Sequence, residues 1–182
     1  MQRHLAPITP CNSLHYPSPS SARHNAYSAV MSCALPPTEI IPRLYISDLS
    51  AAENASTLLS LGITHVVSAM RGRVLFPKGI ALQHLQLPLE DSPFAELASL
   101  LPSSTAFLTN ALRDPNARII VHCAQGISRS TSVVCGFLVA AYGWTPEQAL
   151  QYVKSKHKFA DPNPGFVSQI GEYAATLRKV PR

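Results

Sequence analysis

Short apolar runs and longer amphipathic segments alternate along the chain from residue 40 onward. Runs typical of strands lie at 44–46, 63–69, 82–89 and 118–121. Apolar residues at helical spacing predict helices at 50–61, 99–113 and 130–142, with another starting near 146 and a last one through residues 166–177. Strands that alternate with helices indicate an α/β sandwich, in which helices flank both faces of a central mixed sheet.

Residues that begin and end helices mark several of these boundaries. Ser50 and Glu53 have the spacing of a capping box, and Gly62 would end the helix that they begin. The residues TPEQ at 145–148 supply a second capping box, with proline at the first helical position. The last helix is expected to carry one apolar stripe, formed by Phe166, Ile170 and Leu177.

The first 38 residues differ in composition from the rest of the chain. They hold many of the prolines and serines and no acidic residue. Such a segment buries too little apolar surface to fold, so we expect residues 1–38 to be a disordered tail and residues 39–182 to form one domain. Arg3, Arg23 and the scarcity of acidic residues also fit a mitochondrial transit peptide, but the prolines between residues 7 and 19 oppose its amphipathic helix.

Composition narrows the choice of partners and compartment. Of the net charge of +5, the tail carries +2, and the remaining basic residues are not interleaved with aromatic ones, so no nucleic-acid partner is expected. Basic residues in the loop 70–79 would instead attract anionic substrates. No apolar run is long enough to span a membrane. Four cysteines without a signal peptide indicate a reducing compartment, the cytoplasm or the nucleus. The oligomeric state stays open.

The segment VHCAQGISRST at 121–131 carries the most specific chemical signal. A strand-like run enters it and a helix-like run leaves it, which places a loop at a helix N-terminus. Backbone N–H groups and the helix dipole favour an anion there. Five residues separate Cys123 from Arg129, and the planar guanidinium matches two phosphate oxygens. Gly126 allows the tight turn that this loop needs. The pattern predicts phosphoryl transfer through a cysteine.

The neighbours of Cys123 would adapt it to this role. A free thiol has a pKa of about 8.5, and a helix N-terminus and a nearby cation lower it. Ser130 could donate its hydroxyl proton to the sulfur, whereas His122 is expected to brace the loop from behind rather than to act as a base. The remaining cysteines, Cys11, Cys33 and Cys135, fit core or surface thiols, with Cys135 facing the core. No histidine has ligand spacing with a cysteine or carboxylate, so neither a metal nor another cofactor is expected.

The intact signature HCxxGxSRS at 122–130 resembles that of the dual-specificity phosphatases in the protein tyrosine phosphatase superfamily. Four further segments, at 40–52, 62–69, 87–97 and 144–170, are similar to the opening strand, central strand, acid-bearing segment and closing helices of that family. The resemblance implies an atypical, stand-alone catalytic domain. It would hydrolyse phosphotyrosine and phosphoserine or phosphothreonine on proteins through a phosphocysteine intermediate.

The resemblance also assigns residue roles. Cys123 would be the nucleophile and Arg129 the phosphate clamp. Asp91, rather than the neighbouring Glu90, would protonate the leaving oxygen, a step that a placed carboxylic acid accelerates by about 10²–10⁴. Asn163 matches a family asparagine that ties down the loop, although an Asn-Pro turn explains it equally well. The phosphate would lie against the loop residues Ala124, Gln125, Gly126, Ile127, Ser128 and Arg129.

Other functions remain open at this stage. A phosphatase of RNA 5′ ends, or of a small phosphorylated sugar or lipid, would use the same loop. The residues between Cys123 and Arg129 are uncharged, which disfavours multiply phosphorylated lipids. The loop 70–79 contains no tyrosine, which indicates a pocket shallower than that of phosphotyrosine-only relatives. A phosphate-binding pseudophosphatase module is the non-enzymatic alternative, disfavoured by the intact cysteine, arginine and acid.

Overall fold

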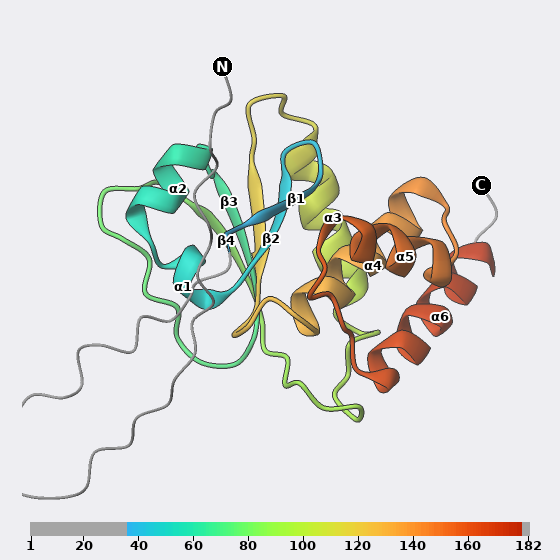
Figure 1. The fold of residues 1–182 in the computed structure, drawn as a ribbon. Coiled ribbons are helices and arrows are strands. Elements are labelled where there is room, and N and C mark those ends of the chain that lie inside the picture. Colours follow the sequence, from blue (N-terminus) through green and yellow to red (C-terminus); the bar gives the residue numbers. More distant parts are fainter. Residues whose placement is uncertain (1–35, 180–182) are drawn as a thin grey trace, which may run out of the picture. The chain divides into compact units, whose positions relative to one another are not determined.

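The computed structural model describes residues 36–179, shown in colour in Figure 1. The predictions for the disordered tail and the transit peptide fall almost wholly on residues outside this range. Those for Cys11 and Cys33 do so as well. The first described strand begins at Thr38, one residue before the expected start of the domain.

Within the described residues, five strands form one sheet in the order β1-β2-β5-β3-β4. Their bounds are Thr38–Ile41 (β1), Leu44–Ser47 (β2), His65–Ala69 (β3), Gln83–Leu87 (β4) and Ile119–His122 (β5). β1 runs antiparallel to β2, and the other neighbouring strands are parallel. β5 therefore lies at the centre, and the carboxyl ends of β2, β3, β4 and β5 share one edge of the sheet.

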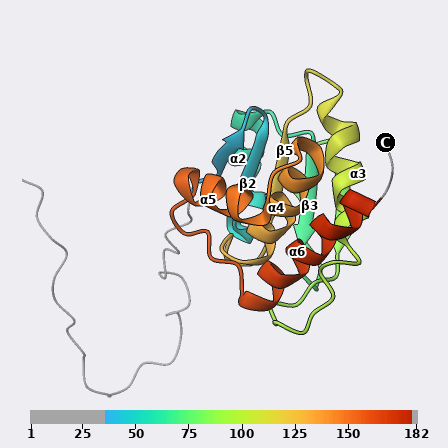
Figure 2. The same ribbon diagram turned by 90° about the vertical axis from the view of Figure 1, so that its right-hand side faces the viewer.

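Within residues 36–179, six helices lie on the two faces of this sheet (Figure 1). Their bounds are Leu49–Ala52 (α1), Ala55–Leu61 (α2), Leu101–Leu112 (α3), Arg129–Tyr142 (α4), Pro146–Lys156 (α5) and Pro164–Lys179 (α6). α1 and α2 lie on one face, and Figure 2 views the molecule from the opposite face, which α3 to α6 cover. The predicted α/β sandwich with a central mixed sheet is confirmed. None of the described helices is long and apolar enough to cross a membrane.

The central strand β5 is buried on both of its faces. Ile119 and Val121 pack into a large core with α3, α4, α5 and α6, whereas Ile120 packs into a smaller core with Leu58 of α2. This alternation follows from the two-residue period of a strand. The loop after β5 therefore starts from a strand that is held on both sides.

One of the predicted helix starts is wrong. In place of a single helix capped by Ser50 and Glu53, the chain forms α1 and α2. The Asp48 carboxylate accepts from the Ala51 N–H at 2.8 Å, and the Asn54 side chain accepts from the Thr57 N–H at 2.9 Å. Two better-placed capping side chains therefore divide the segment. Gly62 ends α2 with a positive φ of 63°, as predicted.

α5 begins where the sequence indicated, whereas α3 begins at Leu101, two residues after the expected start. The capping box between Thr145 and Gln148 is present at the start of α5. On α6 the buried stripe consists of Phe166, Ile170, Tyr173 and Ala174. Leu177, the third residue of the predicted apolar stripe, lies on the last turns of α6 and is 38% exposed, so the buried part of the stripe ends at Ala174.

Candidate active site

The loop between β5 and α4 is shaped by Gly126. This residue has a φ of 72°, and a Cβ there would lie 2.8 Å from the Ser47 carbonyl oxygen and 3.1 Å from the Asp48 nitrogen. Only glycine fits this approach to the turn after β2. The loop is tied to the same turn by the Leu49 N–H, which donates to the Ala124 carbonyl at 3.3 Å. β2 therefore helps to hold the loop against the sheet edge.

The Cys123 thiol lies at the base of this loop and is 1% exposed. Its sulfur accepts from the Gly126 N–H at 3.2 Å and lies 3.4 Å from the Ser130 hydroxyl. Burial raises the pKa of Cys123, but hydrogen bonds from the Ser130 side chain and backbone and from the Gln125 backbone, with the Arg129 charge, outweigh it. The net pKa of Cys123 lies below its ordinary value. The site thus favours the nucleophilic thiolate.

His122 is fully buried behind the loop. Its Nε2 lies 2.6 Å from the Ser68 hydroxyl, its Nδ1 lies 3.4 Å from the Cys123 carbonyl oxygen, and Ser68 also lies 2.9 Å from His84 Nε2. A carbonyl only accepts, so Nδ1 carries the proton, Ser68 donates to His122 Nε2, and His84 donates to Ser68. Burial lowers the pKa of His122 to about 4. A neutral, fixed imidazole suits bracing rather than base catalysis.

Arg129 is the first residue of α4, and its side chain is 15% exposed. One terminal nitrogen, Nη1, donates to the Leu89 carbonyl at 3.4 Å, and Nε lies 3.7 Å from Asp91 Oδ2. Nε is buried and has no hydrogen-bond partner among the described residues. The guanidinium is thus held between the catalytic loop and the acid-bearing segment with donor capacity left for an anion.

Asp91 lies against the loop from the segment that follows β4. Its Oδ1 accepts from the Ser128 hydroxyl at 2.7 Å and from the Asn163 amide at 2.9 Å, while Oδ2 faces Arg129. The neighbouring Glu90 instead pairs with Arg71 at 3.1 Å, where both side chains are exposed. Of the two candidate acids, Asp91 is the one that the structure brings to the catalytic loop, at Ser128 and Arg129.

Asn163 makes contacts that fit both interpretations of its motif, a turn at the start of a helix and a tie to the catalytic loop. Its Oδ1 accepts from the Phe166 N–H at 3.0 Å, which caps α6, and its amide donates to Asp91. Its backbone N–H also donates to the Ser128 hydroxyl at 3.2 Å. The Ser128 hydroxyl is already hydrogen-bonded to Asp91 and Asn163. The contribution to phosphate binding that we expect of Ser128 therefore falls to its backbone.

The other loop residues expected to bind phosphate lie at its open side. Ala124 and Gln125 are exposed, and Ile127 is half-buried. The Ile127 carbonyl accepts from the Asp161 N–H at 3.0 Å, so the loop is also tied to the segment between α5 and α6. No group of three or more histidine, cysteine or acidic side chains within residues 36–179 is arranged to hold a metal ion.

Sequence reasoning missed two residues of α6 that position the acid-bearing segment. A Cβ on Gly165 would lie 2.1 Å from the Pro93 carbonyl oxygen, so the helix and the segment touch through their backbones. Gln169 donates through Nε2 to the Ala95 carbonyl and accepts through Oε1 from the Ala98 N–H, both at 2.9 Å. A glutamine at a helix surface carries no signal of such a role, because it is usually solvated.

His157 is a third residue that the sequence did not single out. It is 4% exposed, its Nε2 donates to the Gly126 carbonyl at 2.9 Å, and its Nδ1 lies 3.0 Å from the Thr38 hydroxyl. The catalytic loop is thereby linked to the first strand of the sheet. Cys135, by contrast, is buried in the core as predicted, where burial raises its pKa to about 12.

The chain matches the family model described as "Dual specificity phosphatase, catalytic domain" over residues 44–176. It is 36% identical over 138 residues to dual specificity protein phosphatase 13B of Homo sapiens, an alignment that covers 72% of this chain and 69% of the relative. It is 35% identical over 145 residues to dual specificity protein phosphatase 26 of Mus musculus, covering 78% and 68%. The crystal structure of human DUSP28 is similar with a TM-score of 0.70 and 31% identity, covering 79% of this chain and 96% of that one.

Proposed function

Because the chain belongs to the dual specificity phosphatase family, we propose that Cys123, Arg129 and Asp91 hydrolyse phosphate esters on protein side chains. Cysteine-based protein phosphatase activity follows from the family. The observation that supports the residue roles is that the segment after β4 brings the Asp91 carboxyl to the loop that already holds the buried Cys123 thiol and the Arg129 guanidinium.

In the first step, the Cys123 thiolate attacks the phosphorus atom of the bound ester. The S–P bond forms as the P–O bond to the substrate breaks, and Asp91 gives its proton to the departing oxygen. The loop N–H groups and the Arg129 guanidinium stabilise the charge on the three non-bridging oxygens. The free Nε of Arg129 is one of the donors available for them.

In the second step, water hydrolyses the phosphocysteine. The Asp91 carboxylate takes a proton from the attacking water as the new P–O bond forms and the S–P bond breaks. The sulfur leaves as a thiolate, and the Ser130 hydroxyl, 3.4 Å from it, stabilises the negative charge. Inorganic phosphate departs and restores the starting enzyme.

The proposed substrates are phosphotyrosine and phosphoserine or phosphothreonine in proteins. The uncharged residues between Cys123 and Arg129 suit a single phosphate on a neutral side chain better than a multiply phosphorylated lipid headgroup. A catalytic thiol must stay reduced, and on this ground we propose the cytoplasm or nucleus as the site of action.

Hydrolysis of an aryl phosphate by the wild type and by Cys123→Ser, with and without vanadate, tests the proposal. We expect vanadate-sensitive turnover in the wild type and none in the variant, which should still bind phosphopeptides. A second variant, Asp91→Ala, should slow hydrolysis of phosphothreonine peptides far more than that of an ester with a good leaving group. A folded, reduced wild type without turnover on any of these esters would refute the proposal.

A further inference from the structure

A hollow of about 450 Å³ lies beside the acid-bearing segment. Its wall combines acidic, basic and apolar side chains. Those that bear on its function are Arg71, Leu89, Glu90, Phe94, Glu96 and Leu100. Neither Cys123 nor Arg129 lines it, so it is separate from the phosphate-binding loop.

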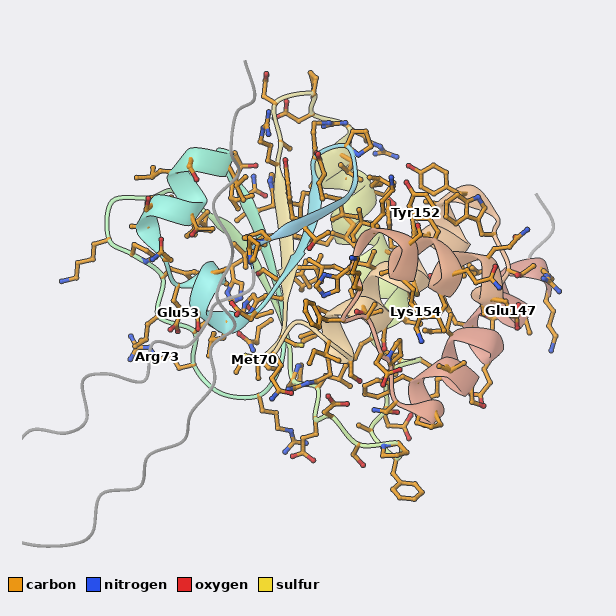
Figure 3. All side chains as sticks on the ribbon, viewed as in Figure 1. Glu53, Met70, Arg73, Glu147, Tyr152 and Lys154 are labelled. Atoms are coloured by element: carbon orange, nitrogen blue, oxygen red, sulfur yellow. The ribbon has the colours of Figure 1, made fainter. Side chains whose placement is uncertain are left out.

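The hollow opens at the same edge of the sheet as the catalytic loop. Arg71 follows β3, and residues 88–90 follow β4, both parallel to β5, which leads into Cys123. Figure 3 shows Met70, the neighbour of Arg71, at this end of the sheet. Leu89 joins the two sites directly, because it lines the hollow while its carbonyl accepts from Arg129. A polypeptide bound at the phosphate site can therefore extend into the hollow.

Phe94 stands at the rim of this hollow with 92% of its surface exposed. It is the most exposed large apolar side chain among residues 36–179. The ring is carried by a segment that is held at both sides, by Gly165 against Pro93 and by Gln169 against Ala95. A large apolar side chain presented to water on a fixed segment is typical of a protein-binding surface.

The charges of the hollow favour a basic partner. Glu90 is paired with Arg71 at 3.1 Å, whereas Glu96 has no ion-pair partner among the described residues. One uncompensated carboxylate therefore remains in the wall. A lysine or arginine of the bound segment would meet an attractive charge there, and an acidic side chain would meet repulsion.

We infer that this hollow binds the polypeptide segment next to the phosphorylated side chain, with an apolar residue against Phe94 and a basic residue near Glu96. The inference rests on the proposed function and adds a sequence preference to it. Phe94 and Glu96 follow Asp91 by three and five positions, and an extended chain advances about 3.3 Å per residue. The preferred apolar and basic residues therefore lie within about five positions of the phosphorylated residue.

Two phosphotyrosine peptides of equal length test this preference. One carries leucine and arginine beside the phosphotyrosine, and the other carries glycine and aspartate at the same positions. We expect the wild type to have a KM about tenfold lower for the first peptide. Phe94→Ala should raise that KM about fivefold, because the peptide loses part of the apolar contact with the phenylalanine ring. Glu96→Gln should raise it about threefold, because the attractive charge is lost.

A small aryl phosphate carries no neighbouring residues to place in the hollow, so its kcat/KM in Phe94→Ala should stay within about twofold of the wild type. Leu59→Ala serves as the matched control, because it removes an apolar side chain that is 65% exposed on α2, on the other face of the sheet. This control should leave the KM of both peptides unchanged.

Three outcomes would count against these ideas in different ways. Equal KM values for the two peptides in an active wild type would overturn the sequence preference alone. An unchanged peptide KM in Phe94→Ala, or an equal loss on peptide and aryl phosphate, would overturn the role of Phe94. A wild type inactive toward the aryl phosphate would overturn the proposed function, and the inference with it.

Discussion

Replacing Gly165 by alanine tests whether the packing of α6 positions the general acid. Gly165 is the second residue of α6, and it lies on Pro93, two residues after Asp91. The new Cβ would lie 2.1 Å from the Pro93 carbonyl oxygen and 2.5 Å from its Cα, whereas ordinary contacts begin at 3.4 Å. Both atoms belong to the backbone, so no side-chain rotation relieves the overlap. The acid-bearing segment or the helix must move by more than 1 Å.

The size of the kinetic effect follows from this displacement. A misplacement of about 1 Å can cost about 10²-fold in rate, and a general acid is worth about 10²–10⁴ in all. We therefore expect kcat of Gly165→Ala to fall about 10²-fold on phosphothreonine peptides, whose leaving alkoxide needs the proton of Asp91. On a nitrophenyl phosphate, whose leaving group is stable without a proton, the loss should stay below about fivefold.

The assay is kcat for a series of esters of increasing leaving-group pKa, compared with Gly171→Ala. Gly171 lies in the same helix, and a Cβ there meets nothing within 4 Å. Gly171→Ala gains about 1 kcal/mol of helix propensity in the interior of α6 and creates no new contact, so it controls for a glycine-to-alanine change in this helix that leaves Pro93 untouched. Gly171→Ala should keep the wild-type rates. Wild-type rates in Gly165→Ala on the poor leaving groups, or an equal loss on every ester, would refute the reasoning.

Two further predictions concern titration. Ser130→Ala removes a hydrogen bond that lowers the pKa of Cys123, so the midpoint of its pH-dependent alkylation should rise, and an unchanged midpoint would exclude this role of Ser130. Burial lowers the pKa of His122 from 6.5 to about 4, so the unfolded chain binds more protons between these values. The stability that neutral His122 contributes is therefore complete above pH 6.5 and lost as the pH falls to about 4, by about 3 kcal/mol. Urea unfolding at several pH values should show this slope, and His122→Gln should flatten it; the same slope in both proteins would assign it to other groups.

Local signals predicted most of the helix boundaries. The capping box at Thr145 and Gln148 and the positive φ of Gly62 were correct, because each depends on residues within one turn. The start of α1 was predicted wrongly for the same reason. Asp48 and Asn54 are capping residues as good as Ser50, and local sequence alone does not rank them.

The residues that give the catalytic loop its chemistry occupy nine consecutive positions, from His122 to Ser130. The thiol, the turn-forming glycine and the cation all lie on one loop, so their proximity needs only a strand before it and a helix after it. For this reason the nucleophile and the clamp could be identified from the pattern alone, and the family resemblance with them.

The contacts that hold the acid depended on the tertiary structure. The family resemblance favoured Asp91 over Glu90, and packing supplies the physical difference between them by joining Asp91 to Ser128, 37 positions away, and to Asn163, 72 positions away. Gln169 reaches Ala95 across 74 positions in the same way. Hydrophobic periodicity and capping signals describe a residue's surroundings over one or two turns. They contain no information on which distant segments meet, and that is decided when α6 packs against the segment that follows β4.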